Sequence, residues 1–168
     1  MQYYIRPVAK FEDFTAQVEA LVTTAADYRC QLIVFPEYFA TQLLTLTDVK
    51  RPVPEQVRSL AKMSPEIVEF FSHLAATKKV YIVAGTLPVL DEQDTNKVYN
   101  DSYFFSPRGE YSSQGKLHMT RWEREEWLVS PRNTLRIFET DFGKAVINIC
   151  YDVEFPELAR AAARRGAN

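Results

Sequence analysis

The chain has 168 residues, enough for one domain with a hydrophobic core, since a chain of this size buries roughly 70% of its unfolded surface. Hydrophobic residues make up 46% of it and charged residues 25%, a globular composition that excludes collagen-like and disordered chains. The net charge of −2 argues against a general electrostatic grip on nucleic acid, which requires a basic surface.

Cysteine usage and hydropathy bear on location and partners. Cys30 and Cys150 are too few for a disulfide framework, which favours a reducing compartment. The start of the sequence lacks the basic-then-apolar order of a signal peptide. The longest uncharged apolar stretch, Val80 to Leu90, is far shorter than the ~20 residues of a membrane span. We therefore expect a cytoplasmic protein with no membrane and no nucleic-acid partner.

Helices and buried strands alternate in the first half of the chain. Apolar residues from Phe11 to Ala25 recur at i, i+3 and i+4, which predicts an amphipathic helix. The apolar run Gln31 to Phe35 predicts a strand buried on both faces. A short helix is predicted within 52–62, and the start signal Ser64-Pro65-Glu66 predicts a second helix after it. Val80 to Ala84 predicts another buried strand.

Hairpins are predicted in the second half. The expected strands are Val98–Phe105, Tyr111–Met119, Arg136–Thr140 and Lys144–Cys150. Turn sequences separate them in pairs, at 106–109 and at 141–143. Pro156 opens a last helix, and Gly166 stands where a glycine commonly ends one. The basic residues near this helix end suit the helix dipole and are interpreted as structural: Arg160, Arg164 and Arg165. The pattern indicates one α/β domain with a mixed sheet across residues 1–168.

Two charged residues are candidates for chemistry. Glu37 directly follows a buried strand and Pro36, so it lies at the carboxyl edge of the sheet, where α/β proteins bind ligands. A carboxylate there suits general base work, although a solvated loop acid gives the same pattern. Lys116 could stabilise a developing oxyanion in a closed site, but an exposed lysine is the commoner case.

Cys150 ends an apolar run shortly before the predicted helix at Pro156. At such an elbow a thiol faces free backbone N–H groups and a positive helix end, which lower a thiol pKa and favour a nucleophilic thiolate. The same N–H groups could receive an oxyanion. A buried structural cysteine is the alternative interpretation. We expect Cys30 to be buried or inert.

Three sequence blocks, taken together, resemble the catalytic blocks of the nitrilase superfamily in order. They are Leu32-Ile-Val-Phe-Pro-Glu-Tyr-Phe39, Gly115-Lys-Leu-His118 and Asn148-Ile-Cys-Tyr-Asp-Val-Glu-Phe-Pro-Glu-Leu-Ala-Arg160. The third block is the most specific, and the resemblance covers nearly the whole chain. It implies a four-layer α-β-β-α sandwich and hydrolysis of carbon–nitrogen bonds in a small amide or nitrile.

The resemblance also implies a role for each residue. Glu37 is the expected general base, Lys116 the cation that stabilises the intermediate, and Cys150 the nucleophile that forms a thioester. The backbone N–H of Tyr151 is expected to share the oxyanion with Lys116. Such a site needs no metal and no organic cofactor, and family members usually form homo-oligomers through a helical face.

A second active-site glutamate occurs in many family members between the lysine and cysteine blocks. The segment Arg124-Glu-Glu-Trp-Leu-Val-Ser-Pro131 makes Glu125 the best match, with Glu126 as the alternative. Arg132 replaces the glycine that usually follows the proline. Asn100, in a block that resembles the family's Tyr-Asn-Ser, is interpreted as structural.

Several alternatives remain open at this stage. His118 could serve as the base for Cys150, as in thiol proteases. His73 and His118 have no zinc-site spacing. Trp122 and Trp127 could line a substrate pocket or pack in a core or interface. Glu157 and Arg160 are expected to pair on the last helix or to support the elbow at Cys150.

Comparison with the family pattern predicts a sandwich that is incomplete at both ends. Most of the usual first strand is expected to be missing before Met1-Gln2, and a further strand is expected after Gly166-Ala167-Asn168. Some features resemble a branch in which the hydrolase domain follows an acetyltransferase domain; they are Tyr4–Pro7, Ala26–Tyr28 and Arg121–Trp127. Two function classes stay open: an amidase-type hydrolase, and a non-catalytic fragment or interaction subunit that retains the motif.

Overall fold

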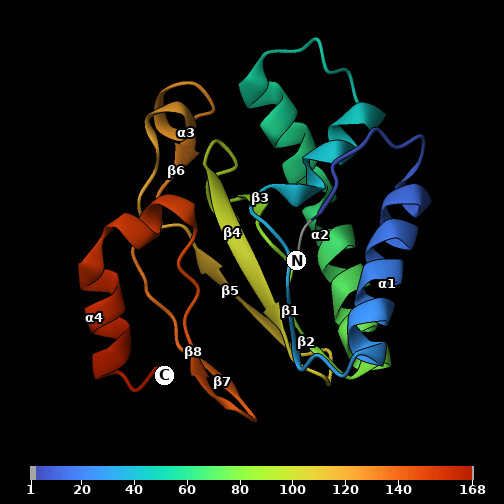
Figure 1. Ribbon diagram of the computed structural model, residues 1–168. Helices are drawn as coiled ribbons and strands as arrows, with labels where there is room; N and C mark the ends of the chain where they lie inside the picture. Colours follow the sequence, from blue (N-terminus) through green and yellow to red (C-terminus); the bar gives the residue numbers. More distant parts are fainter. Residues whose placement is uncertain (1–2, 168) are drawn as a thin grey trace.

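A mixed six-stranded sheet forms the centre of the protein, and two long helices cover one of its faces (Figure 1). The computed structural model describes residues 3–167. The helices are α1 (Phe11–Asp27) and α2 (Val53–Lys78), and the 3-10 helix η1 (Phe39–Leu46) packs against both of them. The strands of this sheet are β1 (Leu32–Val34), β2 (Tyr81–Val83), β3 (Leu87–Leu90), β4 (Val98–Phe105), β5 (Tyr111–Gly115) and β6 (Val129–Ser130).

Strand β4 organises the sheet. β2 and β3 pair antiparallel with β4, β5 also pairs antiparallel with it, and β6 pairs parallel with it. β1 adds to β2 in parallel, with Ile33 opposite Ile82. The predicted turn at 106–109 joins β4 to β5, and Gly109 adopts a φ of 81° there. This topology brings residues at the ends of β1, β4 and β5 to one edge of the sheet (Figure 1).

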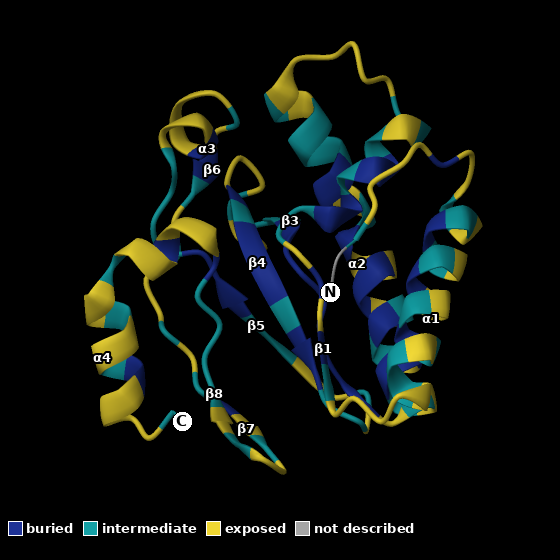
Figure 2. Cartoon of the chain, viewed as in Figure 1, coloured by how far each residue is buried: buried dark blue, intermediate teal, exposed yellow. Residues whose placement is uncertain are grey.

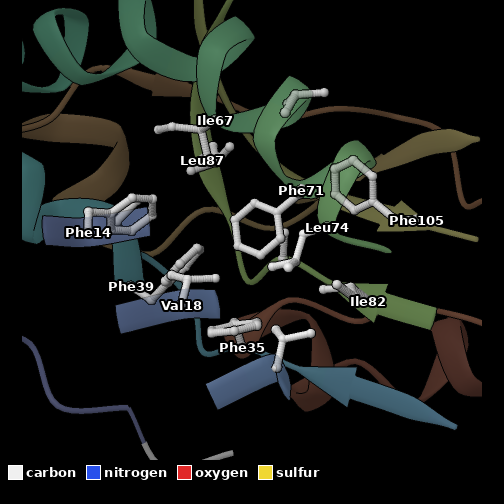
Figure 3. Close-up of a cluster of buried hydrophobic side chains, with 14 of the residues drawn as sticks. Phe14, Val18, Phe35, Phe39, Ile67, Phe71, Leu74, Ile82, Leu87 and Phe105 are labelled. Atoms are coloured by element: carbon white, nitrogen blue, oxygen red, sulfur yellow. The ribbon is translucent and has the colours of Figure 1, made fainter. Parts of the chain in front are cut away.

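Aromatic and aliphatic side chains fill the space between the helices and the sheet (Figure 3). Phe71 of α2 contacts Phe35, Phe39 and Phe105, which come from three other parts of the chain. Burying a side chain of this size stabilises the fold by ~1.5–3 kcal/mol. This layer is the main core, and it anchors the segments on both sides of Glu37.

A second, smaller apolar layer lies on the opposite face of the sheet. Tyr81, Val83 and Phe104 of that face pack with Phe138, which belongs to β7 (Phe138–Thr140). β7 forms an antiparallel two-stranded sheet with β8 (Gly143–Ala145). Beyond it lie η2 (Cys150–Glu154) and α4 (Pro156–Arg164) (Figure 1). The layers therefore follow the predicted order of helix, sheet, sheet and helix, and α4 has mostly exposed residues (Figure 2).

The prediction of two separate helices within 52–78 was wrong, because α2 is continuous and contains Pro65. The Ser64 hydroxyl does not cap a helix; it donates a 2.6 Å hydrogen bond to the Pro88 carbonyl of β3. Proline removes one helical hydrogen bond. Buried residues on both sides of it, including Leu60 and Phe71, hold the two halves against the sheet and offset this loss.

Other expectations also need correction. β5 ends at Gly115 and β8 at Ala145, so both strands are shorter than the apolar patterns predict. Val34 is 45% exposed, so β1 is not buried on both faces. Cys30 was expected to be buried or inert; it is exposed, so the first of these alternatives was wrong. Met1, Gln2 and Asn168, where the missing strands are expected, lie outside the described residues. No helix among residues 3–167 is long and apolar enough to cross a membrane.

Candidate active site

Lys116 is the buried cation at the centre of the site. It follows β5, and its side chain is 1% exposed. Its Nζ lies 2.9 Å from Glu37 Oε1 and 2.7 Å from Glu123 Oε2. Burial acts to lower the pKa of Lys116, but the hydrogen bonds to the two carboxylates outweigh burial and raise the pKa above its ordinary value. The ammonium is therefore held charged between two anions.

The backbone around Glu37 is tightly fixed. Tyr38 adopts the left-handed conformation, with a φ of 54°, and its N–H donates to the Thr86 hydroxyl at 3.0 Å. Gly85 has a φ of 54°, and a Cβ there would lie 2.1 Å from the Pro36 carbonyl oxygen. Only glycine allows this close approach. The result is a carboxylate with a side-chain exposure of 22%, aimed at the lysine from the end of β1.

Glu123 is the second carboxylate of the site. It belongs to the short helix α3 (Arg121–Glu125) and is 2% exposed. Its Oε2 accepts hydrogen bonds from the Thr120 N–H at 3.0 Å and the Thr120 hydroxyl at 2.8 Å. Its Oε1 accepts one from the Tyr38 hydroxyl at 2.9 Å. Burial would raise the pKa of Glu123, but the bonds from Lys116 and Thr120 hold it below the ordinary value.

Asn100 ties the two carboxylates together. Its Nδ2 donates to Glu37 Oε1 at 2.8 Å and to Glu123 Oε1 at 3.2 Å, and the residue is 1% exposed. Its backbone carbonyl also accepts from the Lys116 N–H at 2.9 Å. The residue interpreted as structural from the sequence therefore bonds both carboxylates of the site and the backbone of Lys116.

Cys150 begins η2 and adopts a φ of 48°, a conformation that a residue with a side chain rarely adopts. The residue is accessible to solvent. Protein atoms that bury one side of the thiol raise its pKa, and the charge and hydrogen bond of Glu37 raise it further. Lys116 and the Tyr151 N–H act in the opposite direction and do not compensate. The expectation of a lowered thiol pKa was wrong, because burial and the adjacent carboxylate outweigh the elbow's N–H group.

Glu125 does not lie in the site. Its carboxylate is on the surface, 2.9 Å from Arg121 Nε and 3.3 Å from Arg124 Nη2. Glu123 takes the place expected for Glu125, because α3 turns Glu123 toward Lys116. The sequence carried a signal for it: Thr120-Arg-Trp-Glu123 matches the capping box, in which the glutamate folds back onto the N-cap.

His118 is engaged elsewhere. Its Nδ1 lies 2.9 Å from Asp152 Oδ1, and its ring stacks on Phe155 with centroids 3.6 Å apart. The carboxylate next to the Cys150 thiol is that of Glu37. The geometry thus favours Glu37 over His118 as the partner of Cys150.

Arg132 fixes the loop after Lys116. Its N–H donates to the Lys116 carbonyl at 2.9 Å, and its guanidinium lies 2.9 Å from Asp101 Oδ2 and 3.5 Å from the centre of the Tyr99 ring. A Cβ on Gly115 would lie 2.1 Å from Arg132 Cγ. The arginine that departs from the family pattern is therefore packed against β4 and β5 and supports the lysine segment.

Two hollows flank the site. A small one of about 110 Å³ contains Glu37 and Cys150 in its lining, together with Ser102 and Asn148. A larger one of about 740 Å³ has His118, Trp122, Tyr151 and Phe155 among its lining residues. Trp122 is 61% exposed and faces this hollow, whereas Trp127 packs edge-on against Tyr38 at 5.4 Å. Within residues 3–167 no three His, Cys, Asp or Glu side chains are grouped as metal ligands would be.

Comparison with known proteins identifies the family. Residues 1–168 match the carbon–nitrogen hydrolase family over the whole chain. The chain belongs to this family, and thus to the nitrilase superfamily. The probable hydrolase YhcX of Bacillus subtilis is 40% identical over 167 residues, which cover 99% of this chain and 32% of that protein. The omega-amidase NIT3 of Saccharomyces cerevisiae is 34% identical over 145 residues, 82% of this chain and 48% of that protein. The chain thus spans between about a third and a half of the length of these relatives.

Solved structures support the fold. Saccharomyces cerevisiae Nit3 superposes with a TM-score of 0.77 at 28% identity, covering 97% of this chain and 58% of that one. An amidase from Nesterenkonia superposes with a TM-score of 0.78 at 22% identity, covering 100% of this chain and 62% of that one. The layered arrangement of this carbon–nitrogen hydrolase chain is therefore the nitrilase fold, as the sequence predicts.

Proposed function

We propose that the protein hydrolyses the carbon–nitrogen bond of small amides through a thioester on Cys150. The observation that carries the proposal is a buried lysine held between two carboxylates, one of which, Glu37, also faces the Cys150 thiol. Relatives named omega-amidases support amides as the substrate class of this proposal. A relative described as a nitrilase, from Pyrococcus abyssi and 33% identical over 156 residues, keeps nitriles as the second substrate class.

In the proposed first half-reaction, Glu37 takes the proton of the thiol as Sγ attacks the carbonyl carbon. The carbonyl oxygen becomes an oxyanion, which the Lys116 ammonium and the Tyr151 N–H stabilise. Glu37 then returns the proton to the leaving nitrogen. The carbon–nitrogen bond breaks, an amine or ammonia departs, and the acyl group remains on sulfur as a thioester.

In the proposed second half-reaction, water attacks the thioester carbon while Glu37 accepts a proton from it. The same two donors stabilise the second oxyanion. The carbon–sulfur bond breaks, the acid departs, and Sγ recovers its proton. A thiol with a raised pKa suits this order of reaction steps, because a nucleophile that rests as the neutral thiol requires a base beside it.

Mass spectrometry and turnover test the proposal together. The protein is incubated with a panel of short amides and nitriles, quenched in acid and weighed intact, and ammonia release is followed in parallel. We expect an added acyl mass that maps to Cys150 and turnover that Cys150→Ala abolishes. Glu37→Gln should abolish both. Turnover that survives Cys150→Ala would refute the mechanism, whereas no acyl mass and no turnover with any substrate would favour the non-catalytic alternative.

Location and assembly are further proposals. Composition and charge support a cytoplasmic protein, and the exposed helix α4 offers a face for assembly into a homo-oligomer. Sedimentation velocity of the protein over a range of concentrations tests the assembly.

A further inference from the structure

A buried carboxylate with no part in the proposed chemistry, Asp152, lies between the segment that carries Lys116 and the elbow that carries Cys150. It is 1% exposed. It comes two residues after the nucleophile, within η2. A buried carboxylate is costly unless its oxygens are paired, so its partners indicate what it is for.

Its partners come from both catalytic segments. From the lysine side, Asp152 accepts hydrogen bonds from the Leu117 N–H at 3.3 Å and the His118 N–H at 2.8 Å, and it pairs with His118 Nδ1 at 2.9 Å. From the cysteine side, it accepts the Ile149 N–H at 3.2 Å. Hydrogen bonds to a carboxylate are stronger than those between neutral groups. One side chain therefore links two segments that are far apart in the sequence, with His118 in one and Ile149 in the other.

Both linked segments need such support. β5 ends at Gly115, so the residues that follow Lys116 leave the sheet ladder. Cys150 adopts a strained positive φ, and Ile149 directly precedes it. Strained residues at functional sites persist only when their surroundings fix them.

We propose that Asp152 is a positioning residue that sets the separation between the Lys116 ammonium and the Cys150 thiol. The proposal rests on the proposed function for its catalytic consequence. Without the carboxylate, the Leu117 and His118 N–H groups lose their acceptor, and the segment after Lys116 loses its hydrogen-bonded link to the elbow. Small displacements of catalytic groups reduce rates strongly.

Asp152→Asn is the principal test variant, because it keeps the shape but turns an NH₂ group toward N–H donors. Asp152→Glu keeps the charge and supports folding, but its longer arm shifts the two segments relative to each other. Asp27→Asn makes the same chemical change at an exposed position outside the site and serves as the matched control. For each variant, kcat is expressed per Cys150 that reacts with iodoacetamide, and urea unfolding is measured separately.

We expect Asp152→Asn to lower kcat per titrated site by about 10- to 100-fold, with KM within about threefold, since it disturbs positioning rather than substrate contact. Asp152→Glu should lower kcat in the same way while losing less stability than Asp152→Asn, because it keeps the charge, and Asp27→Asn should match the wild type. If either Asp152 variant is less stable but keeps the wild-type kcat per titrated site, Asp152 only stabilises the fold and the proposal is overturned.

Labelling of Cys150 gives a readout that does not depend on turnover. Glu37, Lys116 and the Tyr151 N–H face the thiol, and Lys116 is the cation among them. If the Lys116 ammonium moves away from the thiol, it stabilises the thiolate less and the pKa of Cys150 rises. The pH profile of Cys150 alkylation should therefore shift to higher pH in both Asp152 variants. An unchanged profile would overturn the proposal. If the wild type hydrolyses nothing, the proposed function fails, and the alkylation profiles still decide whether Asp152 positions Lys116.

Discussion

Replacing Glu123 by Gln tests the charge arrangement of the site most directly. The change keeps the size of the side chain and removes one of the two negative charges beside Lys116. In the wild type, the Lys116 ammonium and the N–H and hydroxyl of Thr120 donate hydrogen bonds to the Glu123 carboxylate. The glutamine NH₂ group is itself a donor, so it faces these donors without an acceptor. Glu125→Gln is the matched control, because the same change two residues away affects a surface carboxylate.

The cost can be estimated from the burial of the pair. Removing one partner of a buried ion pair typically costs ~3–5 kcal/mol. Glu37 remains 2.9 Å from the ammonium, so we expect the low end for Glu123→Gln, about 3 kcal/mol. For a chain of this length that corresponds to a fall in Tm of roughly 6–12 °C. Glu125→Gln should leave Tm almost unchanged, since exposed pairs contribute little.

Thermal and urea unfolding, followed by circular dichroism, measure this difference. Activity should fall by about 100-fold in Glu123→Gln, because Lys116 is drawn toward Glu37, the carboxylate that still pairs with it, and away from the oxyanion position. Equal losses of stability in the two variants, or a larger loss in Glu125→Gln, would refute the assignment of Glu123 to the site.

The dependence of stability on pH gives a second test of the same residue. The folded-state pKa of Glu123 is lowered, so its contribution to stability is present above the ordinary pKa of about 4.3 and is lost as pH falls through the lower folded value. Below about pH 4.3, the wild-type free energy of unfolding should therefore fall more steeply with acid than that of Glu123→Gln. Urea titrations at several pH values measure both slopes, and parallel slopes would contradict the lowered pKa.

Two further outcomes follow from the site geometry. At neutral pH the Cys150 thiol should react with iodoacetamide more slowly than the Cys30 thiol, because the pKa of Cys150 is raised. Glu37→Gln should speed the labelling of Cys150 and abolish hydrolysis. Peptide mapping of labelled protein tests this, and slower labelling in the variant would contradict the stated effect of the carboxylate. Gly85→Ala should cost at least about 2 kcal/mol of unfolding free energy, measured in urea, since it adds a backbone clash to an unfavourable φ. Gly166 is the control, because it also has a positive φ but a Cβ added there would lie 3.8 Å from its nearest neighbour. Gly166→Ala should therefore cost only about 1 kcal/mol of unfolding free energy. Equal costs in the two variants would rule out the clash at Gly85.

The strand pattern predicted only part of where the main candidate residues gather. Glu37 follows the predicted strand 31–35, whereas Lys116 was expected inside the strand 111–119. β5 ends at Gly115, so Lys116 directly follows it and lies 2.9 Å from Glu37 at the same edge of the sheet. Apolar periodicity also predicted α1 and β4 closely. Periodicity did not predict the continuity of α2, because Pro65 and Ser64 form a start signal that tertiary packing overrides.

The second glutamate was assigned wrongly because a loop pattern was weighed above a local signal. The family's proline-anchored pattern pointed to Glu125, and Arg132 had already broken that pattern. The capping box from Thr120 to Glu123 is a local hydrogen-bonding requirement, and it turned Glu123 inward whatever the loop length. A charged residue with a local reason to fold back onto its own backbone is a better candidate for a buried site than one matched by spacing alone.

The thiol pKa was assigned the wrong sign for a related reason. An elbow with free N–H groups lowers a thiol pKa when nothing else is near, but sequence does not reveal that a carboxylate faces the same sulfur. The charged groups at the centre are one cation, Lys116, and two anions, Glu37 and Glu123, with Asn100 donating to both anions. This excess of negative charge opposes a third anion at Cys150. In the mechanism proposed above, the resting nucleophile is therefore the neutral thiol, and attack on the amide carbon requires transfer of the thiol proton to Glu37.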